Sequence, residues 1–167
     1  MENGKSFKDN ALIKARFASE LTLHHYPTIA DDSGICIDNL NGAPGIFSAR
    51  WAHENNYSFA FEKIKQHLNE KGLNLNGQHA KFVCVLALID KNKNEFIFEG
   101  ILKGKIVFPP RGKNGFGYDP IFIPLNFNKT LAQFNSSFKN SISHRKKALV
   151  KLLKHSLFKK LPLNYIL

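Results

Sequence analysis

The segment 80–106, AKFVCVLALIDKNKNEFIFEGILKGKI, decides the fold class of this chain. Residues 80–90 form a nearly unbroken apolar run, residues 91–94 are polar, and residues 95–102 alternate between apolar and polar side chains. This order is typical of two antiparallel strands joined as a hairpin. The segment 105–108 is predicted to extend the same sheet.

Patterns on both sides of the hairpin predict further helices and strands. A helix is expected from Ser6, which forms a capping-box pattern with Asp9, to about Thr22. Apolar spacing predicts further helices at 57–72 and 141–161 and further strands at 28–30, 35–37 and 121–123, the strand at 28–30 ending abruptly at 31–34. Without a repeat or linker, residues 1–167 are expected to form a single α/β domain with a mixed central sheet and flanking helices.

The composition fits a folded protein with a basic surface. The 167 residues are 43% hydrophobic and carry a formal net charge of +11, with 20 Lys and only 4 Arg. Because base readout and bidentate phosphate contacts favour Arg, the Lys excess indicates solvated surface rather than a nucleic-acid interface. The alternative is a small basic protein that binds nucleic acid or a membrane surface through the amphipathic last helix.

Cysteine usage and hydropathy predict the compartment. Cys36 and Cys84 lie inside apolar runs, and we expect both to be buried free thiols. No apolar run approaches the roughly 20 residues of a membrane span, and the first residues do not resemble a signal peptide. We therefore expect a soluble, cytoplasmic protein that binds neither membrane nor nucleic acid.

The stretch Asp31-Asp32-Ser33-Gly34 carries the strongest chemical signal near a strand. Carboxylates at a strand end can hold Mg²⁺, and Ser and Gly let the backbone approach a phosphate. Adjacent strand residues point to opposite faces, so only one carboxylate is expected to face a ligand. The alternative is an Asx turn capped by Ser33.

Two later segments also carry candidate ligand contacts. Within the Gly- and Pro-rich stretch 109–120, Phe116 could stack on a base while Asp119 accepts hydrogen bonds from ring N–H groups; alternatively, Phe116 plugs the core. Lys139 and the residues 141–145 gather donors beside a helix start, which suits a carbonyl oxygen or an anion. The alternative there is a solvated basic helix.

Five ordered motifs resemble a known series. They are residues 4–15 (GKSFKDNALIKA), 30–34 (ADDSG), 42–50 (GAPGIFSAR), 115–122 (GFGYDPIF) and 139–148 (KNSISHRKKA). Together they are similar to the inosine triphosphate pyrophosphatase family, which hydrolyses non-standard purine nucleoside triphosphates. The resemblance implies two lobes around a long central sheet, with the nucleotide between them. It also implies a homodimer and Mg²⁺-dependent cleavage of ITP, dITP or XTP to the monophosphate and pyrophosphate.

The resemblance assigns roles to individual residues. Asp32 would bind the metal and accept the proton of the attacking water, with Asp31 and Asn10 in support. The substrate would contact Lys14 and Ser33 at its phosphate or sugar, Phe116, Gly117, Tyr118 and Asp119 along the purine, and Lys139, His144 and Arg145 at the base edge. Four cations, with His144 counted as protonated, would then serve a single nucleotide.

One departure concerns the segment that precedes these motifs in the family. A strand and an Asn- and Lys-containing loop that holds the triphosphate are absent, and the expected acidic metal ligand falls near Glu2. One hypothesis is a family enzyme whose assigned start is too late. The other is a truncated, weakly active or inactive nucleotide-binding remnant.

Overall fold

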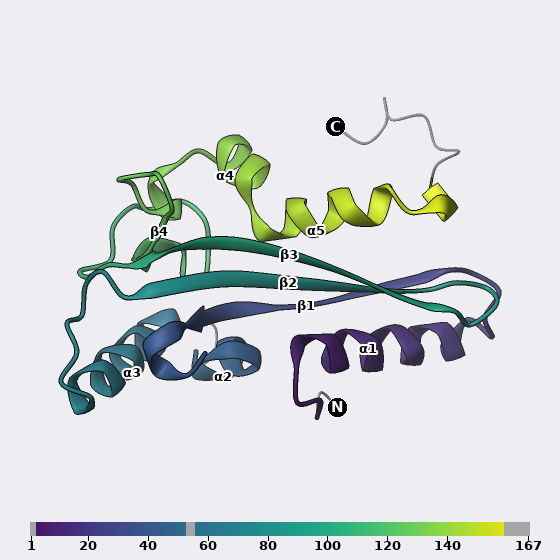
Figure 1. The fold of residues 1–167 in the computed structure, drawn as a ribbon, viewed down its shortest axis with the longest axis horizontal. Coiled ribbons are helices and arrows are strands. Elements are labelled where there is room, and N and C mark those ends of the chain that lie inside the picture. The colour runs from purple at the N-terminus through teal and green to yellow at the C-terminus, as the bar shows by residue number, and fades with distance from the viewer. Residues whose placement is uncertain (1–2, 53–55, 159–167) are drawn as a thin grey trace.

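The long hairpin of β2 and β3 forms the centre of the computed structural model, which describes residues 3–52 and 56–158 (Figure 1). Four strands lie in the spatial order β1 (Thr28–Ile37), β2 (His79–Ile89), β3 (Glu95–Ile106) and β4 (Phe122–Pro124), and each neighbouring pair is antiparallel. Ile89 pairs with Glu95 at the turn. The predicted hairpin is therefore confirmed, whereas the expectation of a mixed sheet is wrong, because every described strand pair is antiparallel.

Five α-helices and five short 3₁₀ turns are described around this sheet. The helices are α1 (Phe7–Leu21), α2 (Ser48–Trp51), α3 (Tyr57–Glu70), α4 (Ser136–Ile142) and α5 (His144–Leu153). The 3₁₀ turns are Asp38–Leu40, Gly45–Phe47, Asp119–Ile121, Leu131–Gln133 and Ser156–Phe158. No strand precedes α1 within the described residues.

Helix α1 begins where the capping pattern predicts. The Ser6 hydroxyl accepts a hydrogen bond from the Asp9 amide at 3.1 Å, which satisfies one free donor of the first turn. The inner face of the helix packs on one face of the sheet in a core of Ala11, Leu12, Ala15, Cys36, Val83, Val85, Ala87 and Ile89. Alternate residues of β2 from Val83 to Ile89 belong to this core, as strand alternation requires.

Strand β1 does not break at its acidic residues. The prediction that it ends at 31–34 is wrong, because Asp31 pairs with Leu86 and Asp32 with Val85 in a ladder that continues from Thr28 to Ile37. Backbone hydrogen bonds to the apolar strand β2 hold these residues extended, so pairing overrides the turn preference of Asp, Ser and Gly. The two carboxylates consequently point to opposite faces.

A second core lies on the face of the sheet that points away from α1. It joins α3 to alternate strand residues and to the loops around β4, and includes Ile35, Ile37, Ala60, Phe61, Ile64, Leu68, Phe82, Leu102, Ile106, Tyr118, Ile121 and Phe122. Figure 1 shows α1 and α3 near opposite ends of the long strands. The two separate cores give the chain the two-lobed α/β architecture that the resemblance implies.

The single helix expected over 141–161 is wrong. Helix α4 ends at Ile142, Ser143 is extended, and the Ser143 hydroxyl accepts a hydrogen bond from the Lys146 amide at 3.0 Å to cap α5. A serine hydroxyl competes for backbone donors, which favours a cap over a helix interior. Because α5 ends at Leu153, the long amphipathic surface helix does not form over the described residues; residues 159–161 lie outside them.

Both cysteines are free and buried, as predicted. Burial raises the pKa of the Cys36 and Cys84 thiols above the ordinary range. Within residues 3–52 and 56–158, no helix combines the length and apolarity that crossing a bilayer requires.

Gly100 lets α5 lie directly on the sheet. A Cβ at this position would stand 2.0 Å from the His144 carbonyl oxygen and 2.4 Å from the Ala148 nitrogen, both backbone atoms of α5. This close approach fixes the height of the first turn of α5 above β3.

Replacing Gly100 by Ala should therefore push α5 away from the sheet. We expect Gly100→Ala to lower the free energy of unfolding by about 1–3 kcal/mol, the usual range for overpacking, as measured by urea denaturation. Lys103→Ala, on an exposed position of the same strand, is the control and should change it by less than about 0.5 kcal/mol. Equal stability of the two variants would contradict this packing role.

Candidate functional site

Asp32 lies on the α1 face of the sheet and receives two side chains from that helix. Lys14 Nζ is 2.9 Å from Asp32 Oδ1, and Asn10 Nδ2 donates to Asp32 Oδ2 at 3.2 Å. Asn10 and Lys14 stand four residues apart and so share one face of α1. The structure brings these three residues together, and Asp32 is only 8% exposed.

Asn10 also fixes the chain that leads into α1. This side chain is fully buried, and its Oδ1 accepts a hydrogen bond from the Gly4 amide at 2.9 Å. One amide group therefore ties the Gly4 backbone, the first turn of the helix and Asp32 together. Such a fully satisfied buried amide holds the carboxylate in one orientation.

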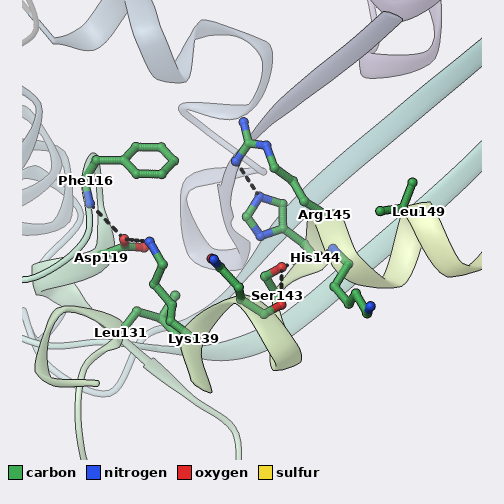
Figure 2. A pocket seen from close by; sticks show the side chains of 10 residues that line it. Phe116, Asp119, Leu131, Lys139, Ser143, His144, Arg145 and Leu149 are labelled. Atoms are coloured by element: carbon green, nitrogen blue, oxygen red, sulfur yellow. Dashed lines mark hydrogen bonds and ion pairs between the residues drawn. The ribbon is translucent and has the colours of Figure 1, made fainter. Parts of the chain in front are cut away.

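A cavity of about 270 Å³ opens on the opposite side of the sheet, between the loop before β4 and the junction of α4 with α5 (Figure 2). It is lined by Phe116, Asp119, Leu131, Lys139, Asn140, Ser143, His144, Arg145, Lys146 and Leu149. Phe116 lies at the rim of this cavity, and the residue is 65% exposed. Phe116 therefore does not plug the core and is available for stacking.

Asp119 connects the two walls of this cavity. Its Oδ2 accepts a hydrogen bond from the Phe116 amide at 2.9 Å and lies 3.0 Å from Lys139 Nζ. Lys139 Nζ in turn lies 4.8 Å from the centre of the Phe116 ring. Through this one oxygen, the buried Asp119 carboxylate positions an aromatic ring and a cation beside each other.

His144 and Arg145 begin α5 and line the same cavity. The His144 ring stacks on Phe82 with centroids 4.9 Å apart and an angle of 10° between planes. Its Nε2 lies 3.4 Å from an Arg145 nitrogen, and its buried Nδ1 has no hydrogen-bond partner among the described residues. The Arg145 guanidinium carbon lies 5.8 Å from the Phe116 ring centre.

His144 is neutral at physiological pH. Burial, which is the largest cause, and the neighbouring charges of Arg145, Lys139 and Lys147 together lower its pKa to about 3. Counting protonated His144 among the ligand-binding cations is therefore wrong. Because a neutral imidazole has one donor and one acceptor nitrogen, it can exchange hydrogen bonds of either sense with a base.

Gly117 and Tyr118 form the back of the aromatic wall. Gly117 adopts a φ of +65°, which favours glycine at this turn. Tyr118 is buried, and its hydroxyl donates to the Ser48 carbonyl oxygen at 2.8 Å. These two residues, with Ser33, Tyr57 and Arg145, also line a smaller cavity of about 160 Å³ next to the first.

Asp31 and Ser33 lie on the face of β1 that points away from Asp32. The Ser33 hydroxyl donates to Asp31 Oδ2 at 3.0 Å, and the same oxygen lies 3.7 Å from an Arg145 nitrogen. Asp31 therefore approaches Arg145, which lines both cavities, and not the partners of Asp32. Strand β1 therefore presents Asp32 to the residues of α1 and Asp31 to Ser33 and Arg145.

The donor set around Asp32 fits a hard cation only in combination with a substrate. No cluster of three or more His, Cys, Asp or Glu side chains occurs among the described residues, and Glu2 lies outside them. Mg²⁺ is commonly held by one or two carboxylates together with substrate phosphates. Asp32 can supply such an oxygen ligand.

Some lining residues were not predicted from the sequence. Tyr57, Leu131 and Asn140 come from α3, a 3₁₀ turn and α4, and only the fold brings them to the cavities. Their side chains belong to no motif whose residue types and spacing indicate a binding site. No sequence signal could have found them.

Comparison with known proteins gives consistent matches. The family model described as the Ham1 family matches residues 1–155. A "dITP/XTP pyrophosphatase" of Zymomonas mobilis is 44% identical over 92% of this chain and 72% of the relative, and one of Thermoanaerobacter pseudethanolicus is 45% identical over 90% and 74%. The solved structure of a HAM1 protein from Coxiella burnetii superposes with a TM-score of 0.83 at 42% identity, over 91% of this chain and 77% of that one.

The neutral state of His144 gives a pH prediction. Because the unfolded histidine binds a proton near pH 6.5 and the folded one only near 3, protonation favours the unfolded chain as pH falls between these values. His144 thus destabilises the fold progressively below about pH 6.5 and has no such effect above it. In NMR titration, the His144 ring resonances should keep their neutral shifts at pH 5 and above.

The same nuclei in the urea-unfolded chain serve as the control and should titrate near 6.5. A folded-state midpoint above about pH 5.5 would contradict the burial that lowers this pKa.

Proposed function

Because the chain belongs to the Ham1 family, we propose that it hydrolyses the non-standard purine nucleoside triphosphates ITP, dITP and XTP to the monophosphate and pyrophosphate. One observation carries the proposal. Strand β1 holds Asp32 with Lys14 and Asn10 on one face, and Asp31 beside the Phe116 cavity on the other. A phosphate-side group and a base-side group therefore share one rigid element, as a nucleotide requires.

At the phosphate side, Asp32 accepts a proton from the attacking water. Its buried carboxylate is oriented by Asn10, and Lys14 places a positive charge beside it that also suits a phosphate oxygen. Asp32 and the substrate phosphates would together hold Mg²⁺. The bound ion would neutralise the charge that develops on the phosphoanhydride oxygens. Lys14 contacts the phosphate or sugar from this face of β1, and Ser33 contacts the phosphate or sugar from the opposite face.

At the base side, Phe116 stacks on the purine while Lys139 and Arg145 donate to the 6-oxo group of hypoxanthine or xanthine. Adenine carries an amine there, so the same donors face another donor and disfavour it. Neutral His144, which lines the cavity, supplies a further hydrogen bond to the ring. Gly117, Tyr118 and Asp119 hold this wall in place.

The proposal includes a homodimer in the cytoplasm. Large apolar side chains remain exposed near the C-terminal end of α1 and the start of β1, namely Phe17, Leu21, Leu23, Tyr26 and Ile29. Exposed apolar patches of this kind often mark protein interfaces. The two free, buried cysteines suit a reducing compartment.

Asp32→Asn tests the catalytic assignment. Asparagine keeps the shape of the side chain but cannot accept the proton, so the rate of pyrophosphate release from ITP with Mg²⁺ should fall about 10²- to 10⁴-fold. The control Glu95→Gln, which removes the exposed partner of Arg16, should keep the wild-type rate.

Wild-type chain that binds ITP but releases no pyrophosphate would support the alternative of an inactive nucleotide-binding remnant. Binding to DNA or anionic vesicles that Asp32→Asn leaves unchanged, without ITP hydrolysis, would favour a basic surface-binding protein instead.

Lys139→Ala tests the base assignment. Loss of a charged donor to the 6-oxo group should raise the KM for ITP about tenfold while changing the KM for ATP much less, as measured by steady-state kinetics. Lys151→Ala, at an exposed position further along α5, is the matched control. An unchanged ratio of kcat/KM for ITP over ATP would remove Lys139 from base recognition.

A further inference from the structure

The two adjacent carboxylates of β1 have separate surroundings. Asp32 is buried against α1, whereas the Asp31 side chain is 47% exposed on the other face, where α5 begins. The uninterrupted ladder between β1 and β2 enforces this alternation. A role for Asp31 must therefore be sought among the residues on its own side.

On that side, Asp31 is held ready for a cation. Ser33, two residues further along the same face, donates its hydroxyl to Asp31 Oδ2 at 3.0 Å. The same oxygen lies 3.7 Å from Arg145 Nη2. One contact orients the carboxylate, and the other directs it toward Arg145.

Arg145 has few other fixed contacts. Its side chain is 49% exposed and its guanidinium carbon lies 5.8 Å from the Phe116 ring centre. Apart from Asp31, its polar contact among the described residues is with the neutral His144 ring, at 3.4 Å. An arginine side chain carries about 2 kcal/mol of rotamer entropy. Unless another group orders it, that freedom is lost when a substrate binds.

The local charges also favour a partner that orders the Arg145 side chain. Lys139, Arg145 and Lys147 all lie close enough to lower the pKa of His144, so positive charges gather around this ring. Asp119 neutralises Lys139 at 3.0 Å. Asp31 is the carboxylate that approaches Arg145 among the described ion pairs.

We propose that Asp31 is a positioning residue for Arg145: it holds the guanidinium at the mouth of the base cavity and so contributes to discrimination between 6-oxo and 6-amino purines. This rests on the proposed function of the site. It also links base recognition to the strand that carries Asp32, because the two carboxylates are consecutive residues of one strand.

The test is equilibrium binding of ITP and ATP by calorimetry in EDTA, where no metal supports turnover. The readout is the ratio of the two dissociation constants, Kd(ATP)/Kd(ITP). Removing a negative charge near a triphosphate strengthens the binding of ITP and ATP alike. This common effect cancels in the ratio of the two dissociation constants. Asp31→Asn should lower the ratio about threefold, as expected for an exposed ion pair, and Asp31→Glu should restore part of it.

A double-mutant cycle separates this role from a structural one. In an Arg145→Gln background, Asp31→Asn should leave the ratio unchanged, because its effect passes through Arg145. Glu95→Gln, which breaks the exposed pair with Arg16, is the matched control and should keep the wild-type ratio. Melting temperatures within about 2 °C of wild type show that the variants fold.

The outcomes are distinguishable. A wild-type chain that releases no pyrophosphate from ITP with Mg²⁺, measured in parallel, overturns the proposed function and this inference with it. A chain that hydrolyses ITP but does not bind ITP more tightly than ATP overturns the inference alone. If wild type prefers ITP, an unchanged or higher ratio in Asp31→Asn overturns the inference alone. So does a fall that persists undiminished in the Arg145→Gln background.

Discussion

The pairing of β1 with β2 is the constraint on which the rest of the structure depends. The acidic, serine and glycine residues of β1 would form a turn in isolation, but their backbone is paired along the apolar strand β2. Extended pairing makes successive side chains alternate between faces. Asp32 consequently enters the α1 side, where Lys14 and Asn10 meet it, while Asp31 and Ser33 enter the side of α5.

Two local features place α5 on its face of the sheet. Gly100 allows the first turn of α5 to lie on β3, and Ser143 ends one helix and caps the next. These contacts bring His144 and Arg145 to the cavity, while Asp119 holds Lys139 and the Phe116 backbone from the other side. Desolvation then keeps His144 neutral, so the charge in the cavity comes from Lys139 and Arg145.

Much of the fold was predictable because its signals are local. The β2–β3 hairpin, the Ser6 cap and the burial of both cysteines follow from patterns spanning a few residues. The broken β1 and the single C-terminal helix were wrong for the same reason: local preference was read where a neighbouring strand or a serine cap determined the outcome. Tyr57, Leu131 and Asn140 could not be found at all, since they reach the cavities only through the tertiary fold.

The sequence by itself determined the family, the hairpin and the identity of the chemical residues, because ordered motifs and periodicity are properties of the chain alone. Only the tertiary structure decided which of those residues contact one another and in which environment each one lies. It placed two consecutive aspartates in different environments, engaged Asp119 with Lys139, and made His144 neutral. Each of these outcomes depends on burial and on charges contributed by distant segments, and such through-space effects have no signature in the order of residues.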